Sequence, residues 1–151
     1  EVAVSLTKNE LGITFVAFSP VAPGFLTDSP PDPTALEPRD IRNTMPRFKP
    51  GNWEANLKLL DGFGAIAQQV GCTMAQLALA WTLARRPFIT PIPGTTRIDH
   101  MEENFAAAGV VLSAEVLERL EALINPSTVH GPRYAASIQP EIDTEELPPA
   151  A

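Results

Sequence analysis

The segment from Gly94 to Arg97 holds residue types that suit the binding of an anion. Gly94 allows a tight turn after an apolar run, and Thr95 and Thr96 place hydroxyl and backbone N–H groups before a region of helical periodicity. The N-terminus of a helix favours negative charge, and the guanidinium of Arg97 matches the geometry of a phosphate. The segment therefore predicts a phosphate site. The residues alone also allow a simpler interpretation, in which Thr96 caps the helix and Arg97 is solvated.

Two further polar side chains fall on the same side of the expected helix. At 100° per residue, His100 lies about 60° and Asn104 about 20° from Arg97 around the helix axis. One helix face can thus carry contacts to a phosphate and to a base together. The alternative is that His100 is an ordinary surface residue.

Two apolar runs predict the strands that hold these residues in place. Residues 12–18 form a nearly continuous β-branched and aromatic run that ends at Ser19-Pro20, and residues 88–92 form a second run that ends at Pro93-Gly94. Runs without alternation are typical of strands that are buried on both faces in a parallel sheet. We therefore expect two buried, parallel strands.

Four stretches have helical periodicity, at about residues 52–70, 73–86, 98–108 and 113–124. Asn52, Thr73 and Ser113 are the expected N-caps, and Gln76 completes a capping box with Thr73. The remnant of another helix is expected at about residues 2–11.

Clustered prolines define the remaining parts of the chain. They make residues 20–51 a long irregular loop, of a kind that often serves as a lid or binding segment, and they mark residues 135–151 as an acidic tail. The order of strand, loop, two helices, strand and two helices is an α/β pattern. Because a two-stranded parallel sheet leaves both edges open, the pattern predicts part of a larger fold.

The composition excludes several classes of function. Eighteen Asp and Glu against eleven Lys and Arg give a net charge of −7, which repels the backbone of nucleic acids. No apolar run approaches the ~18 residues of a membrane helix. The single cysteine, Cys72, fits a reducing compartment, so we expect a cytoplasmic protein. Asp99, Glu102 and Glu103 lack the spacing of a calcium loop, and no metal site is expected.

Several ordered motifs together resemble the aldo-keto reductase family. They are Phe18-Ser19-Pro20, Gly24-Phe25-Leu26-Thr27, Arg47-Phe48, the run from Gly71 to Trp81, the run from Pro91 to Arg97, and Glu102-Glu103-Asn104. That family is a (β/α)8 TIM barrel that uses NADPH to reduce aldehydes and ketones, with the cofactor across the carboxyl ends of the strands. The resemblance implies that residues 1–134 are the C-terminal part of such a barrel, incomplete here, with its seventh and eighth strands.

The resemblance also implies roles for residues after the first strand. Phe18 takes the aromatic position that stacks on the nicotinamide ring, while Ser19 and Val21 stand where the loop touches the pyrophosphate. Val21-Ala22-Pro23 replaces the more usual Leu-Gly-Arg, and Asp28 replaces a frequent glycine. These changes would weaken the hold of the loop on the pyrophosphate.

After the second strand, the resemblance assigns the turn of Gly94, Thr95, Thr96 and Arg97 to the 2′-phosphate of NADP(H). Glu103 and Asn104 match the adenine contacts. His100 stands where many members of the family have arginine.

The catalytic set of the family, which is Asp, Tyr, Lys and His, belongs to the first half of its barrel, and nothing in this chain matches it. Tyr134 lies in a stretch from Gly131 that resembles the C-terminal segment of the family, and His130 is in the same region. We therefore assign no catalytic residue.

Two hypotheses remain open. In the first, the chain is the cofactor-binding part of an NADP(H)-dependent aldo-keto reductase and reduces a carbonyl substrate only together with the missing N-terminal half of the barrel. Glu1 in place of Met fits a start inside a larger reading frame. In the second, the chain is a noncatalytic remnant that serves as a nucleotide-binding or protein-interaction module and self-associates through its open sheet edges.

Overall fold

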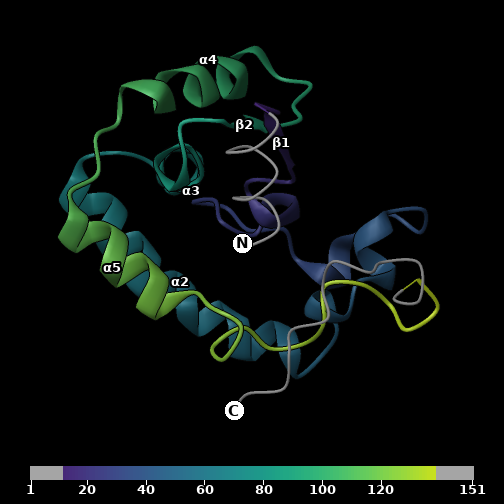
Figure 1. Cartoon of the computed structure of the whole chain (residues 1–151). Coiled ribbons are helices and arrows are strands. Elements are labelled where there is room, and N and C mark those ends of the chain that lie inside the picture. The colour runs from purple at the N-terminus through teal and green to yellow at the C-terminus, as the bar shows by residue number, and fades with distance from the viewer. Residues whose placement is uncertain (1–11, 139–151) are drawn as a thin grey trace.

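A computed structural model describes residues 12–138, in which two strands form a parallel sheet (Figure 1). Strand β1 spans Phe15–Phe18 and β2 spans Ile89–Ile92, with Phe15 paired to Ile89 and Phe18 to Ile92. The predicted parallel pairing is confirmed. Both strands are shorter than predicted, because residues 86–89 form a turn and leave residues 12–14 without a partner segment.

The expected helices are present with modified ends. Helix α2 spans Asn52–Val70, α3 Met74–Arg85, α4 Ile98–Ala106 and α5 Ala114–Leu123. Thr73 and Ser113 cap α3 and α5 as predicted, and Gln76 completes the capping box with Thr73. Helix α4 gives way after Ala106 to a 3-10 turn at Ala107–Gly109. The helix expected at residues 2–11, and residues 139–151 of the expected tail, lie outside the described residues.

The prediction that Asn52 caps α2 is wrong. The cap is Gly51, which has a φ of 86°, a left-handed value that glycine adopts without strain, and its N–H donates to the carboxylate of Glu54. Asn52 is the first helical residue, and its Nδ2 donates to the carbonyl of Pro46 at 3.0 Å. The side chain of Asn52 therefore fixes the preceding turn instead of the helix end.

The segment from 20 to 51 is irregular, as predicted, but it is built from successive 3-10 turns. These are η1 (Ala22–Gly24), η2 (Pro33–Ala35), η3 (Ile41–Thr44) and η4 (Pro46–Phe48). Asp32 and Asp40 accept N–H groups at the starts of η2 and η3. Proline at the start of such turns has the required φ and lacks an N–H group that would otherwise be unpaired.

The core lies among α2, α3 and α5, with α5 alongside α2 (Figure 1). Phe63, Leu77 and Leu120 are fully buried in it, one from each of the three helices. These three helices therefore form the core, and α3 also packs against the sheet.

The prediction that both strands are buried on both faces is wrong for the described residues. Phe15 is 42% exposed, Val16 53% and Ile92 52%. Helix α3 packs against β2 and Arg133 lies over the ring of Phe18, while much of the remaining strand surface is exposed. The apolar runs therefore form exposed apolar surface, of a kind that other polypeptide normally covers.

Replacing Thr73 by alanine should lower the free energy of unfolding by about 1 kcal/mol. The hydroxyl of Thr73 accepts the N–H of Gln76 at 3.2 Å, and this bond would be lost. Urea denaturation followed by circular dichroism measures the change. Thr90→Ala, at an exposed position on β2, is the matched control and should change stability less.

Candidate functional site

A cleft of about 750 Å³ opens where β1 and β2 end. It is bounded by the turn after β1, the loop that includes η3, the start of α3, and the turn after β2 with α4. The residues of the predicted cofactor site that line it are Phe18, Ser19, Val21, Gly94, Thr95, His100, Glu103 and Asn104. Thr96 and Arg97 lie in the same turn as Thr95 but do not line the cleft. The fold thus brings residues far apart in the sequence to the carboxyl ends of two parallel strands, where α/β proteins bind ligands.

The turn after β1 is fixed by its own backbone. Ser19 has a φ of 52°, and its carbonyl accepts the N–H of Ala22 at 3.0 Å. The carbonyl of Val21 accepts the N–H groups of Gly24 at 3.1 Å and Leu26 at 3.2 Å. A left-handed φ at a serine costs conformational energy and persists only where its surroundings hold it. Ser19 and Val21 therefore reach the cleft from a well-defined turn.

The turn after β2 shows that Thr96 does not cap α4. The N-cap is Arg97, which has no side-chain capping bond, and the hydroxyl of Thr95 accepts the N–H of Arg97 at 3.1 Å. Arg97 has an extended backbone, with φ −113° and ψ 137°. Its carbonyl nevertheless accepts the N–H of Met101 at 3.1 Å, the first hydrogen bond of the helix. Of the three residues predicted to share one helix face, His100 and Asn104 line the cleft and Arg97 does not.

The guanidinium of Arg97 is paired with Asp99 at the edge of the cleft. Its Nε donates to Oδ1 at 3.0 Å and its Nη2 to Oδ2 at 2.5 Å. Hydrogen bonds from Arg97 and, to a smaller extent, from the backbone N–H of His100 lower the pKa of Asp99 to about 2. Both side chains are mostly exposed, 64% for Arg97 and 61% for Asp99. A carboxylate of the chain itself therefore occupies the anion position at the start of α4.

Two charged residues outside the predicted cofactor site also line the cleft. Arg42, from η3, has no role in the sequence analysis. Asp28, noted there only as a replacement for glycine, has a carboxylate that accepts the N–H of Met74 at 3.1 Å at the start of α3. Arg42 forms an ion pair with Asp40. The only sequence signal for this arginine is an acidic residue two positions before it, at the start of a 3-10 turn. The fold of the proline-rich loop brings Arg42 to the cleft.

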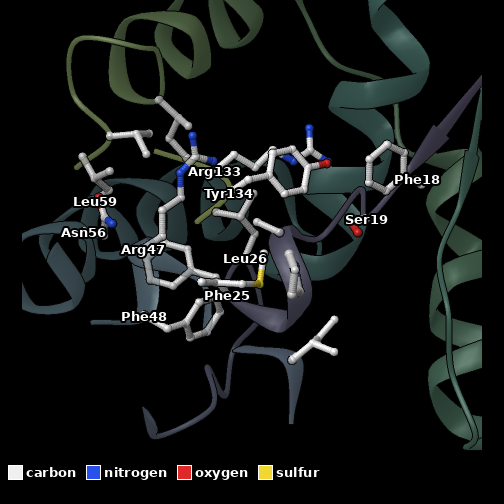
Figure 2. A pocket seen from close by; sticks show the side chains of 16 residues that line it. Phe18, Ser19, Phe25, Leu26, Arg47, Phe48, Asn56, Leu59, Arg133 and Tyr134 are labelled. Carbon is white, nitrogen blue, oxygen red and sulfur yellow. The ribbon is translucent and has the colours of Figure 1, made fainter. Parts of the chain in front are cut away.

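A second cavity of about 480 Å³ adjoins the first and shares Phe18, Ser19 and Pro23 with it. Figure 2 shows Phe25, Leu26 and Phe48 along one side of this cavity and Tyr134 and Phe18 along another. Its lining is mainly apolar and aromatic, with the guanidinium groups of Arg47 and Arg133 as its charged members. Cavities of this size, with few polar groups, suit a small organic molecule.

Asn56 fastens the C-terminal segment to the wall of this second cavity. Its side chain is buried at 3% exposure, donates to the carbonyl of His130 at 2.9 Å and accepts the N–H of His130 at 2.8 Å. Arg47 adds a bond from Nε to the carbonyl of Gly131 at 3.1 Å. The segment that carries Arg133 and Tyr134 is thereby held against α2 and η4.

Arg133 lies over two aromatic rings at the border of the two cavities. Its guanidinium carbon is 4.6 Å from the centre of the Phe18 ring and 5.4 Å from that of Tyr134. Such cation–π contacts order exposed rings. They fix Phe18, which is 55% exposed, between the polar cleft and the apolar cavity.

Two other properties concern residues 12–138 alone. They contain no group of three or more His, Cys, Asp or Glu side chains arranged to hold a metal ion. None of their helices combines the length and the apolar composition that a membrane span requires.

Parallel strands with a polar cleft at their carboxyl ends define an α/β protein with a ligand site built on the strand ends. The family model of the aldo/keto reductases matches residues 3–125. The chain belongs to the aldo/keto reductase family.

Two relatives cover nearly the whole chain. It is 36% identical over 148 residues to aldo-keto reductase str7 of Strobilurus tenacellus and 35% identical over 150 residues to aldo-keto reductase yakc [NADP(+)] of Schizosaccharomyces pombe, with 98% of the chain covered in each case. The chain spans only 44% of the length of each relative.

A solved structure is similar in fold. The thermostable aldo-keto reductase Tm1743, in complex with the inhibitor epalrestat, matches 80% of the chain with a TM-score of 0.53 and 26% identity. The chain covers 33% of that protein.

Proposed function

We propose that the chain is the NADP(H)-binding C-terminal part of an aldo-keto reductase barrel, with β1 and β2 as its seventh and eighth strands. The observation that carries this proposal is the cleft, which gathers residues of both strand ends and of α4 around one space with a mixed polar and apolar lining. Membership of the family and a relative whose name includes NADP(+) support it.

Different residues of the cleft would bind different parts of the cofactor. Phe18 is half-exposed, with Arg133 over its ring, and would offer the remaining surface of the ring to the nicotinamide, while Ser19 and Val21 would lie beside the diphosphate. Glu103 and Asn104 face the cleft from α4 and can hydrogen-bond an adenine. Bound NADPH would supply the hydride, and the residues of this chain would hold and orient the cofactor.

The apolar cavity would then hold the carbonyl compound. It meets the cleft at Phe18 and Ser19, so a molecule bound there would lie beside a nicotinamide stacked on Phe18. Its aromatic lining would exclude water from the site of hydride transfer.

Titration of the chain with NADPH, followed by the fluorescence of the reduced nicotinamide, tests the proposal. We expect saturable binding and, without the first half of the barrel, no reduction of a simple aldehyde, since the proton donor of the family has no counterpart here. Turnover that Tyr134→Phe abolishes would make Tyr134 the proton donor and contradict the proposal.

Asp99→Asn should tighten NADPH binding by about two- to fivefold, a small effect because an exposed ion pair contributes little. The carboxylate competes with the 2′-phosphate for Arg97 and repels it. Its pKa of about 2 keeps Asp99 charged at neutral pH, so a change from about pH 8 to pH 5 should not reproduce the effect. Glu102→Gln, also exposed on α4, is the control. Equal affinities of Asp99→Asn and Glu102→Gln for NADPH would contradict a competition between Asp99 and the 2′-phosphate for Arg97.

The second candidate function is that of an interaction module. It is favoured by the exposed apolar side chains of the strands and of α4, which include Phe15, Val16, Ile98, Met101 and Phe105. Exposed large apolar side chains in this number favour association with another surface. A sharp, concentration-independent melt from a monodisperse monomer would count against it.

A further inference from the structure

The guanidinium of Arg133 lies where the apolar cavity meets the cleft (Figure 2). Its central carbon is 4.6 Å from the centre of the Phe18 ring and 5.4 Å from that of Tyr134. Arg133 lines the apolar cavity and not the cleft, whereas Phe18 lines both. The cation therefore approaches Phe18 from the side of the cavity, and the half-exposed ring keeps surface on the side of the cleft.

The anchors of its chain segment fix the position of this cation. The side chain of Asn56 pairs with both backbone groups of His130, and Nε of Arg47 donates to the carbonyl of Gly131 at 3.1 Å. Arg133 follows the second anchor by two residues, and its contacts with two aromatic rings order its side chain. The positive charge therefore has a defined place beside the ring at the end of β1.

Among the described residues, the charged side chains that line the apolar cavity are both positive. They are Arg47 and Arg133, while the acidic side chains Asp28 and Glu103 line the cleft. A charge in mainly apolar surroundings acts over a longer distance than a charge in water, because the lower effective dielectric constant screens it less. Arg133 therefore makes the electrostatic potential at the ring of Phe18 more positive.

The nicotinamide that is proposed to stack on Phe18 has two charge states. The reduced ring of NADPH is neutral, and the oxidised ring of NADP⁺ is a pyridinium cation. The centres of stacked rings lie ~4.5 Å apart, so the stacked nicotinamide would have its centre at most about 9 Å from the guanidinium carbon of Arg133. Two positive charges at this distance repel each other, and the partly apolar surroundings limit the screening.

We infer that Arg133 makes the site selective for the redox state of the cofactor, because its charge disfavours the cationic nicotinamide of NADP⁺ and not the neutral ring of NADPH. The inference rests on the proposed nucleotide-binding function, with Phe18 as the stacking residue. Such a site binds the hydride donor more tightly than its oxidised product. This selectivity is separate from the role proposed for Arg97, since both redox states carry the 2′-phosphate.

The ratio of the dissociation constants of NADP⁺ and NADPH tests this inference. Titration of the whole chain with NADPH gives one constant, and displacement of NADPH by NADP⁺ gives the other. Arg133→Met should lower the ratio by about fivefold, as expected for two charges ~9 Å apart at an effective dielectric constant between those of a protein surface and water. Arg133→Lys keeps the charge and should keep most of the ratio. Arg39→Met, at an exposed arginine that lines neither cavity, should leave the ratio unchanged.

The ratio also separates the effect of charge from a merely structural role. If Arg133 only orders Phe18, Arg133→Met would weaken both redox states by the same factor, and the unchanged ratio would overturn the inference. A fall in Arg133→Lys as large as that in Arg133→Met would overturn it too, because the charge would not be the cause. An increase in NaCl from about 0.02 M to about 0.5 M should lower the ratio more in the unmodified chain than in Arg133→Met. An unmodified chain that binds neither redox state would remove the proposed function as well.

Discussion

Replacing Arg97 by alanine should weaken NADPH binding by about tenfold and leave NADH binding nearly unchanged. The guanidinium would face the 2′-phosphate, which NADH lacks. The loss of one charged hydrogen bond corresponds to roughly a ten- to hundredfold loss of affinity. We expect the lower end of this range, because Arg97 is 64% exposed and shares its donors with Asp99. Fluorescence titration with each nucleotide measures both constants.

Arg86→Ala is the matched control for this result. Arg86 is exposed, lies outside the cleft, and donates to the carbonyl of Arg85. Its loss should change neither affinity. A loss of both NADPH and NADH binding in Arg97→Ala would place Arg97 at the diphosphate or in folding, and the inferred preference for NADP(H) would lose its basis.

Replacing Asn56 by alanine should lower the free energy of unfolding by about 2–3 kcal/mol. Two hydrogen bonds to the backbone of His130 would be lost from a buried side chain, and both backbone groups would need new partners. Because these bonds hold the segment of Arg133 and Tyr134 in place, the second cavity should open as well. Urea denaturation measures the stability.

Two variants sharpen the interpretation of this result. Asn56→Asp can still accept the N–H of His130 but cannot donate to its carbonyl, so it should also be clearly destabilised. Gln68→Ala changes an exposed amide on the same helix and should lie within about 0.5 kcal/mol of the unmodified chain. A similar stability of Asn56→Ala and Gln68→Ala would contradict the role of Asn56 as an anchor.

Much of the local structure follows from short-range patterns in the sequence. Thr73 and Gln76 form the predicted capping box, and Gly71 ends α2 with a φ of 80°. These features depend on neighbours within four residues and can therefore be predicted from them. Asn52 shows the limit of such rules. Asparagine is a common N-cap, but Gly51 caps α2 here because it adopts the left-handed backbone conformation. Asn52 is therefore the first helical residue, and its side-chain amide donates to the carbonyl of Pro46.

The candidate site was predictable where strand ends determine it. Ser19 and Gly94 each follow an apolar run, and parallel strands must bring such positions to the same edge. Arg42 and Asn56 were not predictable in the same way. Arg42 reaches the cleft through a contact between η3 and the turn at Pro23. Asn56 hydrogen-bonds the backbone of His130, which is 74 positions away in the sequence. Periodicity carries no information about contacts of that range.

The pairing of Phe15 with Ile89 also has a kinetic consequence. The sheet closes a loop that contains all of α2 and α3, and contacts between such distant residues form late because the entropy of loop closure opposes them. During synthesis at ~5–20 residues per second, β1 would emerge several seconds before its partner exists. An apolar strand without a partner is a template for wrong pairing. Helices α2 and α3, which are adjacent in the sequence, are therefore expected to order first, and the newly made chain is expected to need protection until β2 has been synthesised.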